Sequence, residues 1–221
     1  MTASTVAALP RVRVMFDVNV YLDLAQLFQV APADLSASFG QALRRFSDLG
    51  VYPHPCYRDD NRPIDSLRAT ALACDLGAAK VTATATWPAE PGWAVCVSDH
   101  IVTTVLYKLQ RGDNFGWPAA EAGRFVRSVV VPMTQRTGGT YVKVVDPLHC
   151  PPLDREDGLV MASAIAAQAM LLVTCDGPFV EESGQLGVTI EFCNQFIDRV
   201  LRSRRASDAR SVGRQLGWHS R

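Results

Sequence analysis

The chain has 221 residues, no net charge at neutral pH, 48% apolar residues and 20% charged residues. This composition is ordinary for a globular protein, and the length is enough for one α/β domain with a full core. It excludes binding of polyanions through the overall charge, so nucleic-acid binding would have to come from local patches. No apolar run reaches the roughly 18 residues of a membrane span. Residues 1–10 lack a secretory signal, so we expect a cytoplasmic chain without membrane association.

Apolar periodicity and turn residues divide the chain into strands and helices. In chain order we expect a strand at Val12–Phe16, helices at Val18–Val30, Leu35–Leu49 and Ile64–Leu76, a strand at Trp93–Val97, helices at Asp99–Arg111 and Pro118–Val130, a strand at Tyr141–Val145, a helix at 154–169, strands at Met170–Thr174 and Val188–Glu191, and a helix at Phe192–Arg202. The Val131-Pro132 pair is expected to end the helix before it. Residues 52–63 and 147–152 are proline-containing and irregular, and 77–92 receives no assignment.

Strands that alternate with helices indicate βαβ units and therefore an α/β fold with a mainly parallel sheet. Neither a shift in composition nor an internal repeat divides residues 1–202, which we interpret as a single domain. Residues 203–221 form a basic tail, because Leu201–Arg221 contains six arginines and one aspartate. We expect this tail to be poorly ordered.

Polar residues follow three of the expected strands at the point where each strand ends. Asp17 follows the first strand, Ser98 and Asp99 follow the second, and Asp176 follows the strand that begins at Met170. Parallel strands end at one edge of their sheet, and ligands bind outside that edge in open α/β proteins. These residues are therefore candidate site residues, although Asp17 and Ser98 are also suitable helix N-caps.

Carboxylates that converge without matching cations repel one another. A hard divalent cation removes the repulsion, and Mg²⁺ or Mn²⁺ is the usual occupant of a site built from carboxylates and water. Such a cation activates water and neutralises charge on a phosphoryl group. The pattern favours a metal-dependent reaction at phosphate, and the alternative is that these acids are separate caps and surface charges.

Other classes of site find less support in the sequence. The six cysteines form no C-x-x-C pair, and the spacing of His54 from Cys56 and of His149 from Cys150 does not suit zinc. We expect reduced thiols in the core. The chain contains neither of the Gly-rich nucleotide-binding loops, G-x-x-x-x-G-K-[ST] and G-x-G-x-x-G. A phosphatase with an Asp nucleophile would have a second acid at the position of Asn19.

Several segments resemble the landmarks of PIN-domain nucleases, and they occur in the order of that family. They are Val14–Val20 (VMFDVNV), Val95–Ser98 (VCVS), Asp157–Ala164 (DGLVMASA) and Leu171–Asp176 (LLVTCD), and Ile190–Phe192 (IEF) is similar to the family's ending. Each segment alone is a weak signal, and together they are fairly specific.

The resemblance implies a three-layer α/β/α sandwich with a central, mainly parallel sheet and Mg²⁺- or Mn²⁺-dependent cleavage of RNA. By position, the catalytic and metal-binding acids would be Asp17, Asp157 and Asp176. Residues that orient them or a bound water would be Asn19, Ser98 and Thr174. The resemblance places Asp157 in the site, which the order of the elements does not do by itself.

The sequence departs from the family at one position of the site. The family has a Glu about six residues after the position of Ser98, and this chain has Thr104 there. A hydroxyl is an uncharged and weaker ligand, for which Asp99 or Asp154 would compensate. The alternative is a catalytically degenerate relative that binds RNA or a protein without cutting it.

The resemblance also indicates partners. RNA would be the substrate. The charge of the basic tail, apart from the resemblance, predicts contacts with RNA phosphates, and the alternative is a solvated, disordered end. Small bacterial members of the family are toxins of toxin–antitoxin pairs, so a protein antitoxin and a second copy of the chain are candidate partners. This chain is larger than those toxins.

Overall fold

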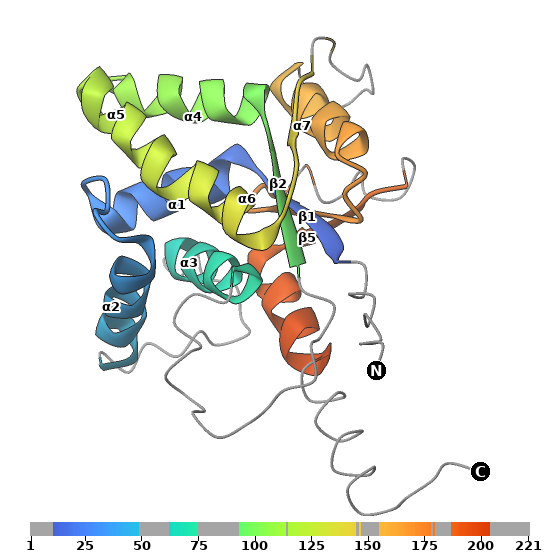
Figure 1. Cartoon of the computed structure of the whole chain (residues 1–221), viewed down its shortest axis with the longest axis horizontal. Coiled ribbons are helices and arrows are strands. Elements are labelled where there is room, and N and C mark those ends of the chain that lie inside the picture. Colours follow the sequence, from blue (N-terminus) through green and yellow to red (C-terminus); the bar gives the residue numbers. More distant parts are fainter. Residues whose placement is uncertain are drawn as a thin grey trace, which may run out of the picture.

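In the residues that the computed structural model describes (11–48, 62–74, 93–113, 115–144, 146, 155–177, 179 and 187–203), five strands form one sheet. The strands are β1 (Val12–Phe16), β2 (Trp93–Ser98), β3 (Tyr141–Val142), β4 (Leu171–Thr174) and β5 (Thr189–Phe192). Their order is β3-β2-β1-β4-β5, and every neighbouring pair is parallel (Figure 1). The predicted α/β fold with a parallel sheet is confirmed.

β1 lies in the middle of the sheet and is covered on both faces. Its side chains from Val14 to Phe16 have no exposed surface, which is why its sequence is a continuous apolar run rather than an alternating one. Val14 lies level with Val95 of β2 and with Leu171 of β4. This register makes β1 and β4 end side by side.

Helices cover both faces of the sheet. They are α1 (Val18–Phe28), α2 (Leu35–Asp48), α3 (Arg62–Ala73), α4 (Asp99–Gln110), α5 (Ala119–Phe125), α6 (Val131–Thr137), α7 (Arg155–Ala166) and a helix over 193–203. Figure 1 shows α1, α3 and α6 on one side of β1 and β2, and α7 on the other. The arrangement is compatible with a three-layer sandwich.

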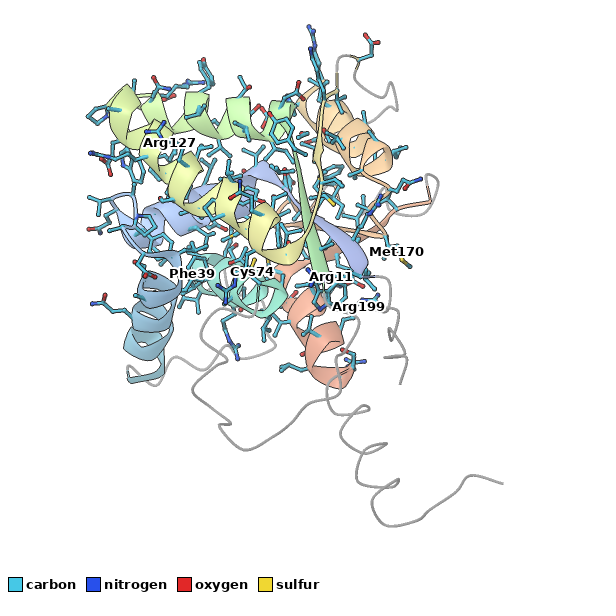
Figure 2. The ribbon with its side chains drawn as sticks, viewed as in Figure 1. Arg11, Phe39, Cys74, Arg127, Met170 and Arg199 are labelled. Atoms are coloured by element: carbon cyan, nitrogen blue, oxygen red, sulfur yellow. The ribbon has the colours of Figure 1, made fainter. Side chains whose placement is uncertain are left out.

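Aromatic rings fill the layer on the α1 side of the sheet. Phe16 of β1 makes edge contacts with Tyr21 of α1 (ring centroids 6.4 Å apart) and with Phe196 (5.9 Å). The 193–203 helix therefore packs on the same face as α1. Figure 2 shows Phe39 and Cys74 among the helices of this layer, while Met170, just before β4, is 62% exposed.

The connections on either side of β1 run over opposite faces of the sheet. The chain passes from β1 to β2 through α1, α2 and α3, and from β3 to β4 through α7. Because β2 and β4 flank β1 and such crossovers are right-handed, the two connections have to lie on different faces. The ends of β1 and β4 therefore form a topological switch point, the usual ligand position of an open α/β sheet.

The helix that follows Pro118 does not end at Val131-Pro132, so that prediction is wrong. α5 continues through a π-helical segment, η3 (Val126–Val130), directly into α6. The backbone N–H of Val131 donates to the carbonyl of Val126, five residues back. This shift starts a new register, so Pro132, which has no N–H, falls in the first turn of α6, where proline is tolerated.

Other boundaries differ slightly from prediction. α1 ends at Phe28 because Gln29 adopts a left-handed conformation (φ 59°) and closes the helix. β3 has two residues and does not extend to Val145. The predictions for 52–61, 77–92, 147–152 and 204–221 concern residues outside the described part of the chain. Within the described residues, no helix has the length and apolar character needed to cross a membrane.

Candidate functional site

Asp17 occupies the junction between β1 and α1 and is 5% exposed. Its Oδ1 accepts a hydrogen bond from the backbone N–H of Val18 (2.6 Å), so Asp17 is the N-cap of α1. Its Oδ2 accepts from Thr174 Oγ1 (2.8 Å) and from Asn19 Nδ2 (3.4 Å). The two interpretations of Asp17 are compatible, because one oxygen caps the helix and the other faces the end of β4.

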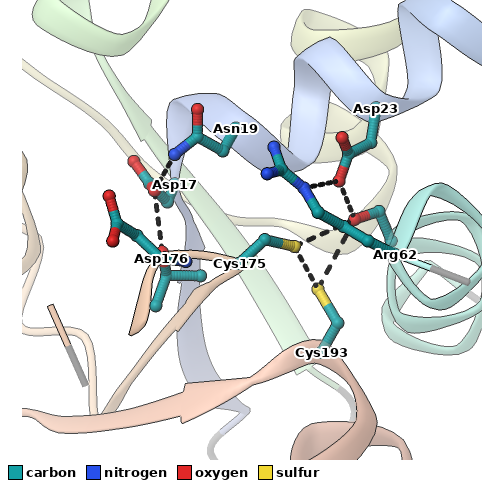
Figure 3. A network of polar contacts seen from close by, with 9 residues as sticks. Asp17, Asn19, Asp23, Arg62, Cys175, Asp176 and Cys193 are labelled. Atoms are coloured by element: carbon teal, nitrogen blue, oxygen red, sulfur yellow. Dashed lines mark hydrogen bonds and ion pairs between the residues drawn. The ribbon is translucent and has the colours of Figure 1, made fainter. Parts of the chain in front are cut away.

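Thr174 connects the ends of β1 and β4. Its hydroxyl is fully buried, donates to Asp17 and accepts from the backbone N–H of Asp176 (3.0 Å). The half-buried carboxylate of Asp176 acts electrostatically on Asp17, and Figure 3 shows the two side chains next to each other. The structure therefore brings together Asp17, Asn19, Thr174 and Asp176 from two separate parts of the sequence.

Burial raises the pKa of Asp17 from its ordinary value of 3.8 to about 6, and the charge of Asp176 adds to the rise. The hydrogen bonds from Thr174 and Val18, and the positive charge of Lys108, act in the opposite direction. Loss of hydration is the largest effect, so the ionised carboxylate is held at a cost. A bound cation would remove that cost, and a perturbed acid at a strand end is a usual mark of a functional site.

Ser98 is the N-cap of α4, as predicted, and it is fully buried. Its Oγ accepts from the backbone N–H of Ile101 (3.2 Å) and from Ser163 Oγ of α7 (2.8 Å). The hydroxyl is thereby committed to positioning α4 and α7 against the end of β2.

Asp99 and Thr104 hydrogen-bond to partners other than Asp17. Asp99 Oδ1 accepts from the backbone N–H groups of His100 (2.9 Å) and Val144 (3.0 Å), which ties the start of α4 to the segment after β3. Thr104 is half-buried, and its Oγ1 lies 3.5 Å from His100 Nδ1. Asp99 therefore has a structural role here, and the position of Thr104 supplies a hydroxyl beside an imidazole instead of an acid.

α7 begins at the same edge of the sheet as Asp17. The expectation that the order of the elements does not place Asp157 at this edge was wrong, because a helix that follows a parallel strand starts where that strand ends. α7 contacts α4, and Glu156 in its first turn forms an ion pair with Lys108 of α4. Asp157 is half-buried in the same turn. Asp154 lies outside the described residues.

Lys108 and Glu156 also belong to this edge of the sheet, and the sequence patterns did not predict them. The positive charge of Lys108 lowers the pKa of Asp17, and its Nζ forms an ion pair with Glu156. A cationic side chain therefore lies among the acids at this edge of the sheet. Two signals were available: Lys108 lies one helical turn after Thr104, and Glu156 directly precedes Asp157. Converging acids need a compensating charge, and Lys108 is the lysine of α4.

The donors at the ends of β1 and β4 suit a hard cation. Asp17 and Asp176 offer carboxylate oxygens and Asn19 offers an amide oxygen, and Mg²⁺ commonly uses one or two carboxylates while it keeps several waters. Across the described residues, no three His, Cys, Asp or Glu side chains are grouped closely enough to hold a metal ion. A cation here would depend on water for the rest of its coordination.

Comparisons with protein-family models, with curated proteins and with solved structures find no match for this chain. Its function is therefore inferred from the geometry and chemistry of this site.

Proposed function

We propose that the chain is a Mg²⁺- or Mn²⁺-dependent ribonuclease with a PIN-like fold. The observation that carries the proposal is the meeting of Asp17 and Asp176, joined through the Thr174 hydroxyl. They meet at the switch point of the sheet, where open α/β proteins bind their ligands. The segments that contribute these residues are among those that resemble PIN-domain landmarks.

The residues of the site have distinct roles in this proposal. Asp17 and Asp176 would hold the cation, which supplies activation of water and neutralisation of charge on a phosphate. Thr174 fixes the orientation of Asp17 by donating to Oδ2, and Asn19 donates to the same oxygen. Asp157 would add a carboxylate from the first turn of α7.

Lys108 keeps the site ready for a cation. A carboxylate has to be ionised to bind a metal, and burial opposes the ionisation of Asp17. The positive charge of Lys108 lowers the pKa of Asp17 and so favours the ionised form. The ion pair with Glu156 fixes Lys108 in place.

Asn19 argues against a phosphatase with an Asp nucleophile. Such an enzyme would have an acid at this position, where it could deliver a proton to a leaving group. Asn19 instead directs its amide nitrogen at Asp17 Oδ2. An amide in this position can orient a carboxylate but cannot exchange a proton with a substrate.

The test is cleavage of labelled single-stranded RNA by the full chain in Mg²⁺, in Mn²⁺ and in EDTA. Cleavage should require the metal and should be lost in Asp17→Asn and Asp176→Asn, while the circular dichroism of the variants stays that of the wild type. Asp198→Asn, in the exposed part of the 193–203 helix, is the matched control and should cleave normally. Metal-dependent cleavage that survives in Asp17→Asn would disprove the assignment.

A second candidate is a module that binds RNA or a protein without cutting, and the Thr104–His100 contact favours it. At the position where the family has its Glu, this chain has the Thr104 hydroxyl in contact with the His100 imidazole. Such a module would bind labelled RNA equally well in EDTA and in Mg²⁺ and would leave it intact. The ribonuclease should bind in both conditions and cut only with metal.

A role as a toxin restrained by an antitoxin is a further part of the proposal. Growth arrest on expression of the wild type, absent on expression of Asp17→Asn, would support it. Equal growth with both chains would count against it.

A further inference from the structure

Two cysteine thiols lie in contact directly beside the candidate site. Cys175 follows the last residue of β4, and Cys193 follows the last residue of β5. Their Sγ atoms are 3.5 Å apart, and both side chains are in the thiol form with exposures of 9% and 2%. Figure 3 shows Cys175 directed away from Asp17 and Asp176 and toward Cys193.

The strand register makes a bond between these sulfurs geometrically feasible. Thr174 and Phe192 are paired residues at the ends of the parallel strands β4 and β5, so Cys175 and Cys193 are the first residues after each strand. Neighbouring strands lie about 4.8 Å apart, within the roughly 4.4–6.8 Å that separates the Cα atoms of a disulfide. The sulfurs would have to approach from 3.5 Å to the bonded distance of about 2.05 Å, by side-chain rotation together with a small shift of the backbone at Cys175.

A polar network surrounds the two thiols and orients them. Ser66 of α3 donates its hydroxyl proton to Asp23 Oδ2 (2.7 Å), and Arg62 donates to the same carboxylate oxygen (3.1 Å). The proton of Ser66 is thereby used, so its oxygen can accept from Cys175 (3.2 Å) or from Cys193 (3.7 Å), while one of the two thiols donates to the other. One buried hydroxyl thus holds both sulfurs on the same side of the sheet.

From this geometry we infer that Cys175 and Cys193 form a modification site that reacts with hydroperoxides to give an intramolecular disulfide, and that the disulfide slows the reaction at the adjacent site. The second half of this inference rests on the proposed function, and the first half does not. The reactants are the two thiols and one hydrogen peroxide, and the products are the disulfide and two waters.

The reaction balances in two steps. Cys175, the more exposed of the two residues, attacks a peroxide oxygen through its sulfur, the O–O bond breaks, and a sulfenic acid and one water result. Cys193 then attacks the Cys175 sulfur, the S–O bond breaks, and the second water leaves. The thiols lose two electrons and two protons in total, which the peroxide takes up. The hydrogen bond with Cys175 and burial raise the pKa of Cys193, so Cys193 is protonated at neutral pH and gives its proton to the departing hydroxyl in the second step.

The disulfide would act on the site through the residues on either side of Cys175. Thr174 holds Asp17, and the backbone N–H of Asp176 is bonded to the Thr174 hydroxyl. A bond to Cys193 would pull Cys175 toward β5 and away from β1, so the Asp176 N–H would move relative to Thr174. Asp17 and Asp176 are both positioned by their hydrogen bonds to Thr174. The cleavage rate should therefore fall about ten-fold, which corresponds to a loss of about 1.4 kcal/mol of transition-state stabilisation.

The experiment treats the reduced full chain with hydrogen peroxide and compares it with the untreated chain. The intact mass should fall by two hydrogens, and the disulfide should join the peptides that contain Cys175 and Cys193. No Lys or Arg separates these cysteines, so trypsin leaves them in one peptide, whereas glutamyl endopeptidase cuts between them after Glu181, Glu182 and Glu191. The crosslink closes a loop between residues 18 apart, so Tm should rise by roughly 6 to 12 °C.

Cys193→Ser is the test variant, and Cys74→Ala, at another buried thiol, is the matched control. In Cys193→Ser the mass loss, the rise in Tm and the ten-fold effect of peroxide should disappear, and dithiothreitol should reverse all three in the wild type and in Cys74→Ala. Peptides that remain unlinked would overturn the modification site. A linked chain that cleaves RNA as fast as the reduced chain would overturn its effect on the site. A chain without cleavage in either state would refute the proposed function, while the mass and Tm still decide on the disulfide.

Discussion

Replacement of Asp17 by Asn is expected to stabilise the metal-free fold at neutral pH. The pKa of Asp17 is raised from 3.8 to about 6 by burial, a rise of about two units. At about 1.36 kcal/mol per unit, the ionised form costs the native state about 3 kcal/mol at pH 7 relative to the protonated form. Asn resembles the protonated carboxyl in charge and size, so it should avoid this cost.

The dependence on pH gives this prediction its sharpest form. Between pH 4 and about pH 6 the native state holds a proton on Asp17 that the unfolded chain has lost, so the stability of the wild type falls as the pH rises through this window. Asp17→Asn cannot show that fall. The difference in unfolding free energy between variant and wild type should therefore grow by about 3 kcal/mol from pH 4 to pH 7.

The assay is urea unfolding in EDTA at half-unit steps from pH 4 to pH 7. Asp65 also has a pKa raised to about 6 by burial, but it is present in both chains and cancels in the difference. Asp198→Asn is the control, and its unfolding free energy should change with pH in parallel with that of the wild type. If the curve for Asp17→Asn also runs parallel to the wild type, the reasoning about burial is refuted. Added Mg²⁺ should stabilise the wild type only.

Further predictions concern the neighbours of Asp17. Thr174→Val removes the hydroxyl that donates to Asp17, so it should raise the pKa of Asp17 and lower the unfolding free energy at pH 7 by about 1–3 kcal/mol, measured by urea unfolding against Thr174→Ser, which retains the donor. Lys108→Gln removes a charge that lowers the pKa of Asp17, so the acid limb of the pH profile of cleavage should move to higher pH. An unchanged profile would show that Lys108 serves only to pair with Glu156 and does not affect the ionisation of Asp17. Thr104→Glu places a carboxylate beside His100 Nδ1, so it should raise the pKa of His100 in an NMR titration and tighten Mn²⁺ binding in calorimetry. A raised pKa without tighter binding would show that Thr104 faces His100 and not the metal.

Parallel strands were the most predictable part of the fold. β1 matches its predicted range, and β2 and β4 differ from theirs by one residue, because strands buried on both faces appear as uninterrupted apolar runs. The candidate site followed from the same feature. Once the strands are known and their parallel order is assumed, Asp17 and Asp176 have to lie at one edge.

Features that depend on packing between distant elements could not be predicted in this way. Proline usually ends a helix, but the π-helical segment before Pro132 shifts the register of the backbone hydrogen bonds. The local sequence contains no signal that predicts this shift. The ion pair between Lys108 and Glu156 requires α4 and α7 to lie side by side. Their contact depends on the Ser98–Ser163 hydrogen bond and on burial that only the assembled layers provide.

The length of β3 has a consequence for association between copies of the chain. Among the strands of the described residues, β3 is an edge strand of two residues, Tyr141 and Val142. The unpaired N–H and C=O groups of so short an edge can template almost no backbone pairing, which is one way in which natural sheets avoid joining edge to edge. A stable dimer buries about 800 Å² on each partner. Continuation of the sheet through β3 would therefore contribute little to the contact area of a homodimer.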